Sequence, residues 1–217
     1  MSFVAVDHLV VAAATLTDGV AWCEATLGVT PGPGGQHPLM GTHNRLLKIA
    51  SDRFPQAYLE IIAIDPDAAA PTRRRWFGMD DLDLSGGPRL VHMVGRSPML
   101  DMHRWGLITV GCKPGDPVRA GRDTPQGPLA WQILVREDGQ LDCGGALPTL
   151  IQWEGRHPTD AMPDSGVMLA SLTLNGVPDR ARDVLRLRGV AVSSAPGPAL
   201  QAVMNTPRGD VMLSSSP

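Results

Sequence analysis

The feature of this 217-residue chain that most constrains its fold is an internal repeat. Three segments share one predicted order of elements, in which a strand and a helix precede a set of further strands. The first segment covers residues 1–65, the second 88–155, and the third, smaller one 166–217. Repeated units of this kind bury their apolar faces against each other. We therefore expect an α+β protein built from repeated βαβββ modules that form cupped, mostly antiparallel sheets, with residues 66–87 as a connecting loop.

The first unit carries the clearest local signals. Residues 3–13 alternate in the manner of a strand, and residues 15–18 (Thr-Leu-Thr-Asp) match a capping box that begins a helix. Gly28 is a typical residue at the end of a helix. Short apolar runs at 45–50 and 58–64 predict two of the strands that close the unit.

The second and third units repeat this order less clearly. The second unit is expected to contain a strand at 88–95, a helix opening at Ser97-Pro98, a loop-like stretch at 111–127, and strands at 129–136 and 147–153. The third is expected to contain a strand at 167–175, a helix from Pro178 to Gly189, and three short strands after it.

One residue of the strand at 58–64 does not belong in an apolar core. Glu60 lies between Leu59 and Ile61, so a strand covered on both faces would bury its carboxylate. A buried carboxylate is costly unless it is paired, protonated or bound to a metal. If the strand instead has one face in water, or lies at a sheet edge, Glu60 is simply solvated.

Alignment of the first two units brings four polar residues into register. His8 aligns with His92 in the opening strands, and Glu60 aligns with Gln152 in the closing strands. Each interrupts an apolar strand, on the side to which its apolar neighbours point. Two imidazoles, one carboxylate and one amide oxygen are typical ligands of a first-row metal ion that keeps open positions for substrate. The alternative is that each histidine is a hydrogen-bonded structural residue.

Other polar and aromatic residues are candidates for a substrate pocket. His43 and Asn44, with His37, belong to a glycine-rich segment in which the backbone can approach a ligand closely. Surface loop histidines are the alternative explanation. Trp153 borders the proposed metal site and is expected to stack on a substrate. His157 is expected at the surface.

Composition excludes several classes of function. The formal net charge is −3 and the basic residues are scattered, so neither a nucleic acid nor a membrane is expected as partner. Three cysteines without Cys-x-x-Cys spacing argue against a disulfide framework and for a reducing, cytoplasmic location. The N-terminal apolar run lacks a basic flank and is interrupted at Asp7, so no signal peptide is expected.

With these residues identified, residues 3–155 resemble the vicinal oxygen chelate superfamily and, within it, the glyoxalase-like domain proteins, the relatives of glyoxalase, bleomycin-resistance protein and extradiol dioxygenase. The resemblance is carried by residues 7–11 (Asp-His-Leu-Val-Val), 35–44 (from Gly-Gln-His-Pro to Gly-Thr-His-Asn), 58–62 (Tyr-Leu-Glu-Ile-Ile) and 147–153 (Leu-Pro-Thr-Leu-Ile-Gln-Trp). It implies paired βαβββ modules in a cupped sheet.

The resemblance also implies a divalent metal ion, with Zn, Fe, Mn and Ni as candidates, held by the first and last strands of each module. His8, Glu60 and His92 match three of the ligand positions. Gln152 departs from the acid commonly found at the fourth, which leaves a three-ligand site or a site that has lost its metal. Glu154, two residues further on, is an alternative source of the missing acid.

The function implied is that of a metal-dependent enzyme, of isomerase, lyase or dioxygenase type, acting on a small oxygen-chelating substrate. Glu60 would be the catalytic residue that moves a proton. The alternative is a metal-free protein that binds or sequesters a small molecule, as bleomycin-resistance relatives do. The third unit is assigned to packing or to the contacts of a possible homodimer.

Overall fold

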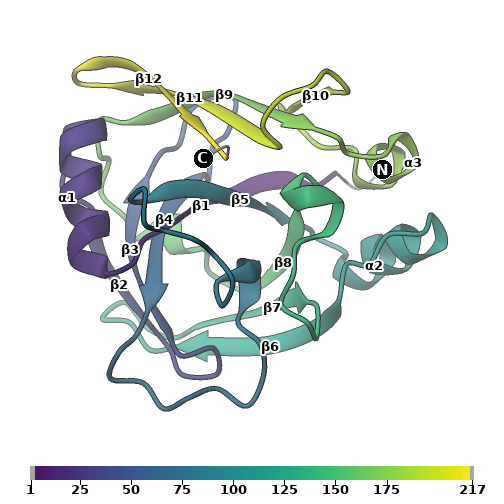
Figure 1. Cartoon of the computed structure of the whole chain (residues 1–217), viewed down its shortest axis with the longest axis horizontal. Coiled ribbons are helices and arrows are strands. Elements are labelled where there is room, and N and C mark those ends of the chain that lie inside the picture. The colour runs from purple at the N-terminus through teal and green to yellow at the C-terminus, as the bar shows by residue number, and fades with distance from the viewer. Residues whose placement is uncertain (1–2, 216–217) are drawn as a thin grey trace.

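The computed structural model describes residues 3–215, which form two sheets. The larger sheet has eight strands in the order β2-β3-β4-β1-β5-β8-β7-β6 and curls into a cup (Figure 1). The smaller sheet, with the order β10-β9-β11-β12, lies across the outside of this cup (Figure 1). The α+β class with cupped, mostly antiparallel sheets is confirmed.

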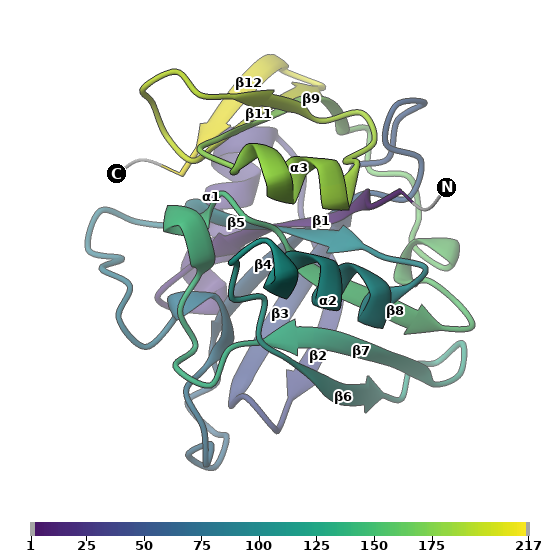
Figure 2. The same cartoon turned by 90° about the vertical axis from the view of Figure 1, so that its right-hand side faces the viewer.

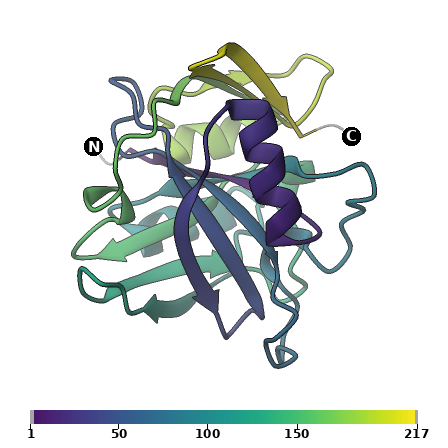
Figure 3. The ribbon, with the colours of Figure 1, turned by 90° about the vertical axis from the view of Figure 1, so that its left-hand side faces the viewer.

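The first module forms one half of the cup. Its elements are β1 (Ala5–Ala12), α1 (Leu16–Leu27), β2 (Gly32–His37), β3 (Thr42–Lys48) and β4 (Tyr58–Ile64). The predicted boundaries of α1 are confirmed, because the Thr15 side chain accepts the backbone N–H of Asp18 and Gly28 ends the helix at φ 78°. Figure 3 shows α1 on the outer side of this half, and β4 returns parallel to β1.

The second module forms the other half. Its elements are β5 (Arg89–Arg96), α2 (Leu100–Thr109), β6 (Asp116–Arg122), β7 (Leu129–Val135) and β8 (Thr149–Glu154). Because β1 pairs antiparallel with β5, the two modules meet through their equivalent first strands. The expectation of a loop throughout 111–127 is wrong. β6 is poor in β-formers, but it is an edge strand held along its length by β7, and an edge position tolerates Pro117.

The third unit keeps the chain order of the first two but not their sheet topology. Its elements are β9 (Met168–Asn175), α3 (Asp179–Leu185), β10 (Ala191–Ser193), β11 (Leu200–Thr206) and β12 (Gly209–Ser214). The first strand pairs with β10 and β11 rather than with its last strand. Figure 2 shows α3 and α2 on the same side of the molecule. Within residues 3–215, no helix combines the length and apolarity that crossing a bilayer requires.

Both faces of the large sheet are buried. Leu9, Leu59 and Ile61 belong to an outer core shared with the helices and the small sheet. Val10 and Ile62, their neighbours along the strands, belong to a second core inside the cup. This double burial explains the nearly continuous apolar runs of β1 and β4.

The connection between the modules, residues 66–87, contributes to the inner core. It contains a short 3₁₀ helix, η1 (Trp76–Gly78), in which Trp76 is 5% exposed and Phe77 is 3% exposed. Both pack with side chains of β1, β7 and β8 inside the cup. The connection is therefore largely a loop, as its proline- and glycine-rich composition indicates, but its two aromatic residues are buried in the inner core.

Candidate functional site

Glu60 is buried on the inner face of the cup, with 5% of its surface exposed. It lies beside Val10 in the parallel β1–β4 ladder, within a strand that is covered on both faces. The alternative in which Glu60 is solvated at an open face or an edge is thus wrong. A carboxylate in this position requires polar partners, and it has two.

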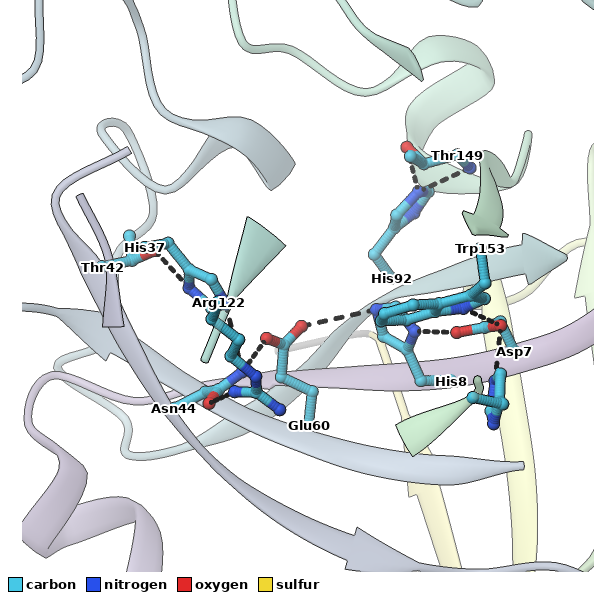
Figure 4. Close-up of polar contacts among 11 residues, drawn as sticks. Asp7, His8, His37, Thr42, Asn44, Glu60, His92, Arg122, Thr149 and Trp153 are labelled. Atoms are coloured by element: carbon cyan, nitrogen blue, oxygen red, sulfur yellow. Dashed lines mark hydrogen bonds and ion pairs between the residues drawn. The ribbon is translucent and has the colours of Figure 1, made fainter. Parts of the chain in front are cut away.

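The first partner of Glu60 is His8, from β1. The His8 Nε2 atom lies 3.4 Å from Glu60 Oε2, and His8 Nδ1 lies 2.7 Å from Asp7 Oδ1 (Figure 4). The imidazole also stacks on the Tyr58 ring with centroids 4.6 Å apart. His8 is therefore held between two carboxylates and a ring face, in one fixed orientation.

Asp7 joins its neighbour His8 because the strand is irregular at this point. The β1–β5 ladder shifts register between Val6 and His8, and such a bulge redirects a side chain that regular alternation would point to the opposite face. Asp7 is fully buried and its Oδ2 atom accepts from Trp153 Nε1 at 2.9 Å and lies 3.0 Å from His157 Nε2. His157 is 5% exposed, so the expectation that it lies at the surface is wrong.

The second partner of Glu60 is Asn44, from β3. Its Nδ2 donates to Glu60 Oε1 at 2.6 Å, while its Oδ1 accepts the backbone N–H of Gly35 at 2.8 Å. These contacts fix which side of the amide faces Glu60. A Cβ atom at Gly34 would meet the Asn44 carbonyl oxygen at 2.1 Å, so the glycine-rich segment allows β2 to approach Asn44 this closely.

His37, at the end of β2, completes the polar wall. Its Nδ1 lies 3.1 Å from Thr42 Oγ1, and its Nε2 lies 3.5 Å from Asn44 Nδ2. The ring is 9% exposed and meets Trp76 edge-on, with centroids 5.0 Å apart. The explanation of His37 as a surface loop histidine is wrong.

Burial and hydrogen bonding oppose each other in setting the charges. Burial raises the pKa of Glu60, but the hydrogen bond and charge of His8 and the Asn44 hydrogen bond outweigh it and lower the pKa to about 2. Burial lowers the pKa of His8, but hydrogen bonds to Asp7 and Glu60 raise it to about 9. The pKa of Asp7 is far below its usual range because its bonds to His157 and His8 exceed the burial effect. Burial lowers the pKa of His37 to about 4.

We expect stability to be greatest near pH 6.5 and to fall on either side. The pKa of His8 rises on folding from 6.5 to about 9, so its contribution is complete below pH 6.5 and is lost as the pH rises through 9. The pKa values of His37 and His92 fall to about 4 and about 3, so their contributions are lost as the pH falls below 6.5. Urea unfolding measured across this range checks the profile. The alkaline decline should be absent in His8→Gln, and its persistence there would contradict the assignment.

An aromatic cavity adjoins Glu60. Its volume is small, about 30 Å³, and it is lined by His8, His37, Asn44 and Glu60 together with the rings of Tyr58, Trp76, Phe77, Trp131 and Trp153. Two lining donors, Trp76 Nε1 and Arg122 Nε, are buried and find no hydrogen-bond partner among residues 3–215. Such donors are costly unless a ligand supplies an acceptor oxygen.

His92 lies on the same face of the sheet but is bonded elsewhere. Its Nε2 accepts the backbone N–H of Thr149 at 3.0 Å, and its Nδ1 lies 3.2 Å from the Gly145 carbonyl oxygen. Figure 4 shows the ring turned toward Thr149 and away from Glu60. Both ring nitrogens are thus occupied, with the proton on Nδ1.

Gln152 lies on the opposite face of β8. Its Oε1 accepts the backbone N–H of Leu100 at 2.8 Å and so caps α2, while its neighbours Ile151 and Trp153 line the cavity. The alignment of Gln152 with Glu60 is therefore one residue out of phase. Glu154 is exposed and pairs with Gln132 instead.

Of the predicted substrate residues, the cavity contains two. Asn44 and Trp153 line it, whereas His43 does not. His43 alternates with Asn44 along β3, so it points away from the cavity, and its Nδ1 lies 3.8 Å from Asp65 Oδ1. In a strand, neighbouring side chains point to opposite faces, which would have predicted that only one of His43 and Asn44 lines the cavity. The glycine-rich sequence of this segment indicates a loop instead, for which alternation makes no such prediction.

The residues do not fit the predicted metal ion as they are arranged. His8 and Glu60 are adjacent, but His92 uses its lone pair on Thr149 and Gln152 faces the other side of the sheet. Among residues 3–215, no cluster of three histidine, cysteine or acidic side chains has the geometry of a metal site. Ligation by all four predicted residues would require His92 to leave Thr149 and β8 to change phase.

Several residues of the site were not predicted from the sequence. Asp7 and Arg122 contact the predicted residues directly, and Trp76 lines the cavity. An aspartate inside an apolar strand, next to a candidate histidine, was a usable signal for Asp7. Arg122 and Trp76 carry no local signal, because one ends a weakly patterned edge strand and the other lies in the connection between the modules.

Comparison with solved structures gives further support for the fold. A hypothetical protein from Staphylococcus aureus is 13% identical and superposes with a TM-score of 0.58, covering 97% of this chain and 84% of that one. Methylmalonyl-CoA epimerases are more loosely similar. That of Streptomyces coelicolor is 18% identical with a TM-score of 0.42, covering 68% and 92%, and that of Mycobacterium tuberculosis is 19% identical with a TM-score of 0.41, covering 72% and 91%.

The Staphylococcus aureus structure supports the fold alone, and the epimerase superpositions are too loose to carry an argument. No curated protein matches the sequence. The model of one family, described as a glyoxalase-like domain, matches residues 6–187 and thus covers both halves of the cup and continues through α3. The protein belongs to this glyoxalase-like domain family.

Proposed function

We propose that the protein is an enzyme that transfers a proton to and from a carbon atom next to a carbonyl group of a small, oxygen-rich substrate. One observation carries the proposal. A buried, ionised carboxylate, Glu60, lines the same cavity as two buried donors that lack acceptors, Trp76 Nε1 and Arg122 Nε. This combination provides a base for a C–H proton, and it provides one neutral and one positively charged hydrogen-bond donor for the oxygen that becomes negative.

The step is balanced without any further reagent. The Glu60 carboxylate takes the proton from carbon, the electrons of the C–H bond form the enolate, and the negative charge develops on oxygen near Arg122 and Trp76. Return of the proton from Glu60 to carbon completes the exchange. An α-keto acid suits this arrangement, because its two adjacent oxygens can accept from both donors.

The neighbours of Glu60 would hold it in position. Asn44 fixes one carboxylate oxygen, and His8 lies near the other while bonded to Asp7. We assign His8 and Asp7 to charge balance and orientation, since neither ring nitrogen of His8 is free to act alone. A divalent metal held by His8, Glu60, His92 and Gln152 stays a prediction, and no step above depends on it.

Exchange of the protons next to the keto group tests the proposal. Incubation of the protein in D₂O with α-ketobutyrate, followed by proton NMR, should show exchange faster than in buffer. Glu60→Gln keeps the shape but removes the base, and the enzymatic rate should fall by about 100-fold or more. Glu137→Gln, which changes an exposed glutamate, is the matched control and should exchange at the parent rate. Equal rates in the parent and Glu60→Gln would refute the assignment.

A second candidate function is metal-free binding of a small molecule without chemistry. The observation that favours it is the low pKa of Glu60, about 2, because a carboxylate so well stabilised is a weak base. The aromatic lining suits sequestration of a flat molecule. Calorimetric binding of α-ketobutyrate without proton exchange would favour this function over the first.

Two further expectations belong to the proposal. The three thiols are free among the described residues, and the reducing, cytoplasmic location stays a prediction. Homodimer formation stays a prediction, with the small sheet as the expected contact surface.

A further inference from the structure

A second and larger cavity adjoins the one that contains Glu60. We call it the outer groove. It is lined by residues 29–34 before and within β2, by Leu46–Lys48 at the end of β3, by residues 122–129 between β6 and β7, and by residues 156–165. Its volume is about 470 Å³.

The two cavities lie side by side and share wall residues. Arg122 and Leu46 line both of them. Arg122 Nη1 lies 3.4 Å from Asn44 Oδ1, which places the guanidinium at the edge of the site, while Arg122 Nε lacks a partner. Figure 4 shows Arg122 beside Asn44 and Glu60. A ligand that reaches from Glu60 past Arg122 would therefore enter the outer groove.

The walls of the outer groove are mainly apolar. Leu46 and Leu129 are each 5% exposed, and Val29 and Met162 are partly buried along its length. The Lys48 ammonium is neutralised by Asp164, with Nζ 2.7 Å from Oδ1.

The remaining lining charges set the direction in which a ligand would bind. Arg156 is exposed, and Arg122 lies at the inner end of the groove. The lining of the outer groove is therefore charged at its inner end, at Arg122, and apolar along its walls. A ligand with the reverse arrangement would leave Arg122 unpaired.

We propose that the ligand is amphipathic, with an oxygen-bearing head beside Glu60 and Arg122 and an apolar tail of several carbon atoms in the outer groove. The placement of the ligand's head rests on the proposed function, and the placement of its tail rests on the outer groove. Its substrate class is thus a medium-chain acid with a keto group next to the carboxylate, rather than a small polar acid.

Calorimetric titration with acids of two chain lengths tests the inference. α-Ketobutyrate has the head alone, and α-ketooctanoate adds four methylene groups. Each methylene that leaves water tightens binding by roughly fourfold, so four of them should make α-ketooctanoate bind about 250-fold more tightly. n-Octanol, which has the chain without the head, serves as the third probe.

Two variants separate the groove from the site. Met162→Glu introduces a charge into the groove at a partly buried position. It should weaken binding of α-ketooctanoate by at least tenfold and leave binding of α-ketobutyrate unchanged. Met102→Glu makes the same change on the exposed face of α2 and should leave both affinities unchanged. Arg122→Gln should weaken both acids to a similar extent.

The possible results distinguish a failure of the outer groove from a failure of the site at Glu60. Equal affinity for the two acids would overturn the inference while leaving the proposed function intact. Binding of n-octanol that is as tight as that of α-ketooctanoate and is lost in Met162→Glu would support the groove and refute the head site. If neither octyl compound binds better than α-ketobutyrate, the groove does not hold a tail.

Discussion

Asp7→Asn is expected to lower the free energy of unfolding by about 3 to 5 kcal/mol, because it breaks a buried charged network at its centre. Asp7 bonds to His8 and Trp153 and lies within 3.0 Å of the His157 ring. An amide keeps one acceptor oxygen and turns two N–H groups toward these donors. It also leaves the positive His8 with Glu60 as its remaining anionic partner.

Urea unfolding of Asp7→Asn measures this loss, and a melting temperature lower by roughly 10 °C should accompany it. Asp52→Asn, at an exposed position, is the control and should change stability by less than about 0.5 kcal/mol. The pH profile gives an independent readout, since removal of Asp7 should reduce the alkaline loss of stability that His8 causes. An Asp7→Asn protein as stable as the parent would show that the negative charge of Asp7 does not stabilise the fold.

Trp76→Ala is expected to cost about 3 to 5 kcal/mol, although the residue belongs to the connection between the modules. Its ring is 5% exposed and packs against Phe77, with centroids 5.5 Å apart, and against His37. Truncation leaves a void between the two halves of the cup and admits water to Glu60. Trp105→Ala is the matched control, because that ring is 59% exposed, and its cost should stay below about 1 kcal/mol.

Trp76→Phe separates packing from hydrogen bonding. The ring keeps most of its apolar contacts but loses an N–H that has no partner within the described part of the chain. Because an unpartnered buried donor is costly, this variant should be nearly as stable as the parent. If the N–H serves a ligand oxygen, the affinity for α-ketobutyrate should fall by roughly tenfold. Unchanged affinity would remove Trp76 from the oxygen-binding part of the proposal.

Local signals in the sequence were sufficient for most of the module architecture. The capping box at Thr15 and the glycine at 28 bound α1 because both depend on backbone groups within one or two turns. The prediction failed at β6, where pairing with β7 compensates for residues that disfavour a strand.

The candidate site was predicted in part. His8 and Glu60 come together because they lie on β1 and β4, which pair directly, and both side chains point to the same face of the sheet. Gln152 lies on the other face of its strand, because the alignment of the two units was one residue out of phase and one residue along a strand exchanges the two faces. His92 has the expected face, but a backbone N–H of Thr149 occupies its lone pair.

The sequence by itself determined the α+β class, the ends of α1 and the presence of one carboxylate in an apolar strand. These properties depend on near neighbours and on period-two alternation, which a linear pattern records. Tertiary structure decided the bulge that turns Asp7 toward His8, the entry of Trp76 into the cup and the position of Arg122 beside Asn44. Each of these depends on contacts between segments far apart in the chain, and such contacts leave no periodic signal in either partner.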